Sequence, residues 1–131
     1  MADRRTVNDL LAWSRSRIER LEPHAAFAAL AAGAILVDTR CTEQRRAMGS
    51  IPGSVHVPLS VLYWRLDPDS GSKDARLADL ERQLILVCAH GYSSSLAAAT
   101  LRDMGFARAS DLKGGFEAWQ ASGLPIEVAL D

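Results

Sequence analysis

The feature that most constrains the fold is an unbroken apolar run at residues 84–87, which ends abruptly at Cys88. A small turn containing Gly91 follows, and an alanine-rich, helix-favouring run begins soon after it. A short strand without polar alternation is typical of a parallel sheet that helices cover on both faces. The order strand, tight loop and helix therefore predicts an α/β domain with a thiol at the carboxyl end of a buried strand.

That position makes Cys88 a candidate nucleophile. Open α/β sheets place their ligands at the carboxyl ends of the strands. The N–H groups at the start of the following helix favour an anion, and so lower the pKa of a nearby thiol. The alternative for Cys88 is a buried, unreactive thiol, which is common among cysteines.

The rest of the chain alternates between strand and helix patterns, which predicts a parallel α/β sheet. We expect further strands at residues 20–22, 34–38, 54–58 and 109–112. We expect helices at residues 6–20, 23–32, 42–48, 60–65, 77–82, 94–104 and 114–122. The first helix should pack against the domain through Val7, Leu10, Leu11, Ser14 and Ile18, which share one face.

Composition excludes several classes of protein. The formal net charge of −1 gives no general attraction for nucleic acid or anionic lipid. Two cysteines are too few for a disulfide scaffold. The longest mostly apolar run, residues 25–37, is too short to span a bilayer, and the N-terminus has no apolar signal core. We therefore expect a cytoplasmic protein with reduced cysteines and no membrane partner.

Five motifs, taken in order, resemble those of a single-domain rhodanese, a sulfurtransferase family. They are Val37-Asp38-Thr39-Arg40 (V-D-x-R), residues 49–54 (G-H-I-P-G-A) with Val57-Pro58 after them, Cys88 at the start of the active-site loop, residues 112–119 (L-x-G-G-x-x-A-W) and Gly123-Leu124-Pro125. Each motif is weak alone, and their order and spacing make the resemblance specific. It covers roughly residues 20–126.

The resemblance implies a three-layer α/β/α rhodanese-like fold with a parallel sheet of about five strands. It implies a rhodanese-like domain at residues 20–131, preceded by an N-terminal helical extension at residues 1–19. It also implies a thiosulfate:cyanide-type sulfurtransferase in which Cys88 carries a persulfide. The substrates would be a small donor (thiosulfate, a persulfide or a thiosulfonate) and a thiol, cyanide or protein acceptor, with no cofactor and with a monomer or homodimer as the assembly.

Backbone N–H groups in a tight loop can hold such an anion without an acidic or basic side chain. The residues expected to form this anion-binding loop are Ala89, His90, Gly91, Tyr92, Ser93 and Ser94. Ser94 and Ser95 can also donate hydrogen bonds or cap the following helix. A general-base role for His90 is the weaker alternative to a ring that faces solvent, because a thiolate needs no base.

Arginine is missing from the loop, and this bears on the substrate. Related phosphatases carry an arginine six positions after the cysteine, where this chain has Ser94, so a phosphoryl group would lack its bidentate cation. Thiosulfate-using rhodaneses often read C-R-x-G-x-R-S, and Ala89 and Ser93 replace both arginines here. Arg65 and Arg40 are candidate cations from outside the loop.

Other candidates have two interpretations each. Asp38 supports the loop or is a structural strand-end carboxylate, and Arg40 binds substrate or forms a salt bridge. Cys41 resolves a modified Cys88 through a disulfide or is incidental. Tyr92 and, less strongly, Trp64 can line the entrance. The three histidines and two cysteines show no zinc-like spacing, so we expect no metal.

Two other functions stay open beside the sulfurtransferase. The missing loop arginines are compatible with a non-catalytic or regulatory rhodanese module that binds a partner. A Cys88–Cys41 pair is compatible with a redox sensor.

Overall fold

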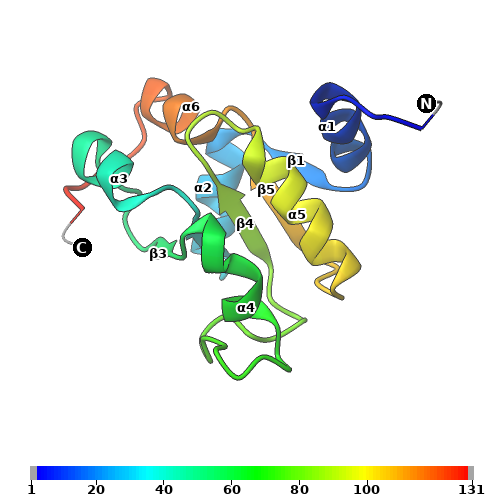
Figure 1. The fold of residues 1–131 in the computed structure, drawn as a ribbon. Helices are drawn as coiled ribbons and strands as arrows, with labels where there is room; N and C mark the ends of the chain where they lie inside the picture. The colour runs from blue at the N-terminus through cyan, green and yellow to red at the C-terminus, as the bar shows by residue number, and fades with distance from the viewer. Residues whose placement is uncertain (1–2, 130–131) are drawn as a thin grey trace.

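The computed structural model describes residues 3–129, which form a five-stranded sheet in the order β1-β5-β4-β2-β3 (Figure 1). The strands are β1 (Glu19–Leu21), β2 (Ile35–Asp38), β3 (Val55–His56), β4 (Leu84–Val87) and β5 (Ala109–Leu112). The helices are α1 (Val7–Ser16), α2 (Pro23–Ala31), α3 (Thr42–Met48), the 3₁₀ turn η1 (Leu59–Val61), α4 (Leu62–Leu66), α5 (Ser93–Asp103) and α6 (Gly115–Ala121).

Every neighbouring pair of strands is parallel, which confirms the α/β prediction. The central strand is β4, which pairs with β2 on one side and β5 on the other. Asp38 lies opposite Val87 in this register. The residues that follow β2 and β4 therefore meet at the same carboxyl edge of the sheet, where Cys88 begins the active-site loop.

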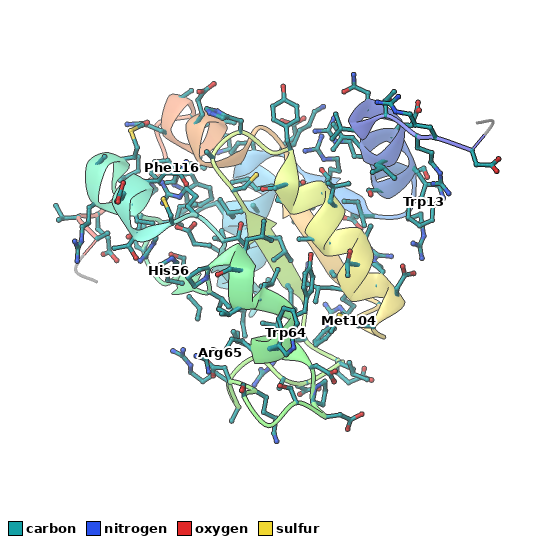
Figure 2. All side chains as sticks on the ribbon, viewed as in Figure 1. Trp13, His56, Trp64, Arg65, Met104 and Phe116 are labelled. Atoms are coloured by element: carbon teal, nitrogen blue, oxygen red, sulfur yellow. The ribbon has the colours of Figure 1, made fainter. Side chains whose placement is uncertain are left out.

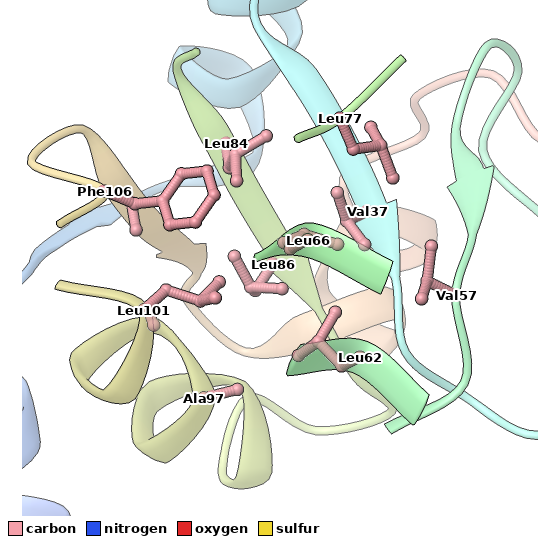
Figure 3. Close-up of a cluster of buried hydrophobic side chains, with 12 residues drawn as sticks. Val37, Val57, Leu62, Leu66, Leu77, Leu84, Leu86, Ala97, Leu101 and Phe106 are labelled. Carbon is pink, nitrogen blue, oxygen red and sulfur yellow. The ribbon is translucent and has the colours of Figure 1, made fainter. Parts of the chain in front are cut away.

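The side chains of β4 divide between two cores, because successive residues of a strand point to opposite faces. Leu84 and Leu86 join the core beneath α4 and α5 (Figure 3). Ile85 and Val87 join the core on the other face, where α2 and α6 pack. The unbroken apolar run thus forms the central strand of the sheet, which is the middle layer of a three-layer α/β/α domain.

The expected helix at residues 77–82 is wrong, since this segment forms successive turns before β4. The carboxylate of Asp79 accepts the backbone N–H of Glu81 at 2.9 Å. Local bonds of this kind compete with helical ones. Leu77 alone anchors the stretch in the core.

The first helix is shorter than expected, and only part of the expected face packs on the domain, including Ser14 and Ile18. It begins at Val7 and ends at Ser16, and it lies along α5 (Figure 1). Val7 and Leu10, expected on the packing face, are 67% and 39% exposed, whereas Ser14 is buried. No helix within residues 3–129 has the length and apolar character needed to cross a bilayer.

The amino end of α6 packs directly on the loop that follows β4. The N–H of Phe116 donates to the carbonyl of Cys88 at 2.9 Å, and the N–H of Glu117 donates to the carbonyl of Ala89 at 3.1 Å. Gly115 makes this approach possible: its φ is +65°, and a Cβ there would lie 2.5 Å from the Cys88 carbonyl oxygen. The loop's shape therefore depends on a glycine far from it in sequence.

We predict that Gly115→Ala lowers the free energy of unfolding by about 3 kcal/mol, from left-handed strain plus overpacking. Gly123→Ala is the matched control, because Gly123 also has a positive φ (+74°) but has open space around it. This control should cost only about 1 kcal/mol. Urea unfolding followed by tryptophan fluorescence measures both variants, and equal losses would contradict the close packing of α6 on the loop.

Candidate active site

Cys88 lies at the carboxyl end of β4 and is 7% exposed. The backbone N–H of Gly91 points at its Sγ, with a nitrogen–sulfur distance of 3.1 Å. Burial raises the pKa of the Cys88 thiol, but hydrogen bonds from the Ser94 and Ser93 hydroxyls and from the backbone N–H groups of Ser94 and Gly91 outweigh burial. The pKa of Cys88 is therefore lowered overall, which favours the thiolate.

The Ser94 hydroxyl has two competing acceptors. Its Oγ lies 2.8 Å from Oδ2 of Asp111 and also within reach of the Cys88 sulfur. A hydroxyl has one proton, so it can donate to the carboxylate or to the sulfur, but not to both at once. The backbone N–H groups of Gly91 and Ser94 do not share their proton with Asp111, so we expect them to stabilise the thiolate more than the Ser94 hydroxyl does.

Of the two expectations for Ser94 and Ser95, that they cap the following helix is wrong and that they donate hydrogen bonds is confirmed. The helix α5 begins at Ser93, and its N-cap Tyr92 makes no side-chain capping bond. Both Ser94 and Ser95 are already inside the first turn, where their hydroxyls lie 2.8 Å from Oδ2 of Asp111. They tie the start of α5 to strand β5.

Asp111 is a fully buried carboxylate on β5 that inspection of the sequence missed. Arg20 on β1 binds it through two contacts, Nε to Oδ1 at 2.9 Å and Nη2 to Oδ2 at 3.2 Å. A buried charge needs such a partner. The available sequence signal is an aspartate inside an otherwise buried short strand, with a possible cationic partner on the neighbouring edge strand.

Two arginines converge on the carbonyl oxygen of Gly91. Arg15 Nη2 lies 2.8 Å from this oxygen, and Arg20 Nη2 lies 2.9 Å from it. Neither was a candidate from the sequence, because both precede the motifs and lie about seventy residues from the loop they contact. Only the pairing of β1 with β5 and the packing of α1 on α5 bring them there.

A cavity of about 320 Å³ opens over Cys88. It is lined by Thr39, Arg40, Cys41, Gln44, Leu59, Cys88, Ala89, His90, Tyr92 and Ser93. The structure thus brings most of the predicted loop together with Arg40 and Cys41 around one hollow. Tyr92 is 62% exposed at its rim.

The expectation that Arg65 faces the site mouth is wrong. Arg65 and Trp64 line a separate hollow, and Arg65 donates to the carbonyl of Ser72 at 3.1 Å. Figure 2 shows both side chains beside α4, well away from Phe116 on the helix that touches the loop. The polar loop after α4 folds back on this helix, and its Ser72 carbonyl binds the Arg65 side chain away from the site.

Asp38 and Arg40 form a buried ion pair at the cavity wall. Arg40 Nη2 lies 2.8 Å from Asp38 Oδ2, and Arg45 Nε lies 3.1 Å from the same oxygen. Arg40 also donates to the Gly49 carbonyl at 2.8 Å and stacks 3.9 Å from the ring centre of Phe116. Arg40 therefore reaches the cavity wall while sharing the Asp38 carboxylate with Arg45.

The histidines lie outside the reacting centre. His90 Nδ1 lies 3.1 Å from a carboxylate oxygen of Glu117, and both side chains are exposed. His56 Nε2 lies 2.7 Å from the carbonyl oxygen of Arg40. Among residues 3–129, no group of three or more histidine, cysteine, aspartate or glutamate side chains is placed to hold a metal ion.

Comparison with known proteins agrees with this geometry. The family model for the rhodanese-like domain matches residues 22–122. The thiosulfate sulfurtransferase GlpE of Pseudomonas fluorescens strain Pf-5 is 40% identical over 114 residues, which are 87% of this chain and 94% of that protein. The same enzyme from Ectopseudomonas mendocina is also 40% identical over 114 residues, with the same coverage.

Solved structures show the same fold. A Rhodopseudomonas palustris protein described as of unknown function and a possible tyrosine phosphatase has a TM-score of 0.88 and 32% identity, covering 97% of this chain and 98% of that one. The polysulfide-sulfur transferase homodimer of Wolinella succinogenes has a TM-score of 0.70 and 24% identity, covering 88% and 82%. On the family match, the curated relatives and the cysteine-centred loop, the chain belongs to the rhodanese-like domain family and is a sulfurtransferase of rhodanese type.

Proposed function

We propose that this chain moves sulfane sulfur from a small donor to a thiophilic acceptor through a persulfide on Cys88. The observation that carries the proposal is the buried Cys88 sulfur, 3.1 Å from the Gly91 nitrogen at the floor of a cavity. Both the resting thiolate and the persulfide are anions, so one set of backbone donors serves both states.

The reaction has two balanced steps. The Cys88 thiolate attacks the outer sulfur of thiosulfate, a new sulfur–sulfur bond forms, and sulfite leaves with the electron pair of the broken bond. The acceptor, such as cyanide, then attacks the outer sulfur of the persulfide and leaves as thiocyanate, which restores the thiolate. No proton has to move in either step, which is why the exposed His90–Glu117 pair has no necessary role.

The donor is a sulfane-sulfur compound, and its identity is part of the proposal. The names of the curated relatives support thiosulfate. Ala89 and Ser93 stand where many thiosulfate-using loops have arginine, and Arg40 is held at the cavity wall by Asp38. We therefore propose that a persulfide or thiosulfonate, with less charge than thiosulfate, is used at least as well.

The remaining assignments follow from the same site. Residues 89–94 form the anion-binding loop, and Arg40 with Asp38 supports the cavity wall. The domain proper spans residues 20–131, with residues 1–19 as an N-terminal extension. Two free thiols also suit the reducing cytoplasm, which we propose as the compartment.

A second candidate function is a thiol switch, which the shared cavity of Cys41 and Cys88 favours. The Cys41 thiol would attack the inner sulfur of the Cys88 persulfide, form a disulfide and pass its proton to the outer sulfur, which leaves as hydrosulfide. Electrons balance without an external oxidant, because the outer sulfur leaves in its reduced form. An external thiol would then reopen the disulfide.

Intact-protein mass spectrometry tests the persulfide. Incubation with thiosulfate or a thiosulfonate should add about 32 Da, one sulfur atom, to the wild type and to Cys41→Ser. Cys88→Ser should gain nothing, and cyanide should remove the added mass while thiocyanate appears. If several donors leave the wild-type mass unchanged, the proposed function fails.

The pH dependence of alkylation tests the activation of Cys88. In a Cys41→Ser background, the iodoacetamide rate should reach half its maximum below about pH 8.5, the value for an ordinary thiol, because hydrogen bonds stabilise the thiolate. Ser93→Ala removes one donor and should move this midpoint upward. A midpoint at or above that of a free cysteine would show that burial outweighs the donors.

The thiol switch makes a different prediction. Protein first persulfidated and then freed of donor should lose mass to about 2 Da below the reduced form, as hydrosulfide is released. Cys41→Ser should keep the added sulfur instead. Persistence of the persulfide in the wild type under the same conditions would remove Cys41 from the chemistry.

A further inference from the structure

The carboxyl-terminal turn of α1 contacts the active-site loop through the side chain of Arg15. Its Nη2 donates to the carbonyl of Gly91 at 2.8 Å, and its Nε donates to the hydroxyl of Ser95 at 3.1 Å. Its guanidinium also lies over the Tyr92 ring, 5.7 Å from the centroid. The N-terminal extension therefore reaches the loop at the residues that surround the cysteine sulfur.

We propose that Arg15, together with Arg20, is a positioning residue that turns the Gly91–Tyr92 peptide so that its N–H faces the sulfur carried by Cys88. This inference rests on the proposed persulfide function, and it assigns to the two arginines the orientation of the backbone that binds the anion. Among residues 3–129, neither arginine forms a hydrogen bond with the Cys88 sulfur. Both act on the opposite end of the same peptide group.

The geometry of the peptide bond supplies the argument. In a planar trans peptide the carbonyl and the N–H point in opposite directions. Two guanidinium groups, at 2.8 and 2.9 Å, hold the Gly91 carbonyl toward the outside of the loop. The N–H of Tyr92 then points to the concave side, where the Gly91 N–H already meets the sulfur of Cys88. A persulfide extends by one sulfur atom into that space.

The two arginines are themselves held in place. Arg20 is fixed by its double contact with the buried Asp111, and Arg15 by the hydroxyl of Ser95. Ser95 in turn lies 2.8 Å from the Asp111 carboxylate. Hydrogen bonds with a charged donor are stronger than neutral ones, so this cluster resists rotation of the peptide.

The charges around the loop also favour an anion. Arg15 and Arg20 stand behind it against one carboxylate, Asp111, which leaves one positive charge in excess. On the cavity side, Arg40 and Arg45 share the Asp38 carboxylate, and the exposed His90 faces Glu117. Cys41 and Tyr92 are the other titratable groups that line the cavity. The excess positive charge thus lies behind the loop, and not at positions 89 and 93 of the loop itself.

Both arginines lie before residues 22–122, the span that matches the family model. A feature built from them belongs to this chain's extension and edge strand rather than to the matched motifs. The extension at residues 1–19 thereby gains a role in the reaction through Arg15.

The test compares Arg15→Met, Arg15→Lys and the control Arg17→Met in the full chain with Cys41→Ser. Arg17 is on the same turn but pairs with Asp103 on α5 and stacks on Trp13, 4.5 Å from the ring centroid. Its variant removes the same charge and one anchor of α1 without touching the loop. Circular dichroism and thermal unfolding check that each variant is folded.

We expect Arg15→Met to raise the alkylation midpoint of Cys88 by about one pH unit and to slow persulfide formation about tenfold at pH 7. The loss in rate should shrink above the midpoint, where the thiol ionises fully in every variant. Arg15→Lys should recover part of the rate, and Arg17→Met should stay within about twofold of the parent.

Two results would overturn the inference. One is an Arg15→Met protein with unchanged midpoint and rate, and the other is an Arg17→Met protein with an equal loss, which would point to the docking of α1 in general. Failure of the parent protein itself to form a persulfide would instead refute the proposed function. The alkylation midpoint reads out the role of Arg15 in either case.

Discussion

The site depends on the hydrogen bonds and the ion pair that satisfy the buried carboxylate of Asp111. A charge in the core is costly unless it is paired, and here Arg20, Ser94 and Ser95 all bind the same group. These partners come from β1 and the first turn of α5, while Asp111 belongs to β5. The need to satisfy one buried charge thus fixes the edge strand, the start of the helix and the floor of the loop relative to one another.

The active-site loop works because its carbonyl groups are bound on the outside. The carbonyls of Cys88 and Ala89 accept N–H groups from α6, and the carbonyl of Gly91 accepts two arginines. With the oxygens held outward, N–H groups are free to face the sulfur, as that of Gly91 does. An anion can then be stabilised in a loop that contains no arginine, at the cost of requiring glycine at position 115.

Local patterns predicted the parts of the chain that depend on local physics. The apolar run of β4, the parallel sheet and the placement of Cys88 at its carboxyl edge are all present, because strand burial and topology follow from hydrophobic pattern. The predictions that were wrong concern side chains with more than one available hydrogen-bond partner. The Asp79 turn replaced an expected helix, and Ser94 bonded a distant carboxylate instead of capping its own helix. Arg65, on α4, bonded the Ser72 carbonyl of the following loop instead of facing the site.

The sequence by itself determined the α/β class, the family motifs and the position of Cys88, the proposed nucleophile, because these depend on residue type and short-range order. Only the tertiary structure decided which charges surround that nucleophile. Arg15 and Arg20 reach Gly91 across more than seventy residues, and Asp111 meets its partners only when β1 and β5 pair. Which groups form a side-chain hydrogen bond depends on their positions in the folded chain. The spacing of residues in the sequence does not predict which distant donor will lie next to a given acceptor.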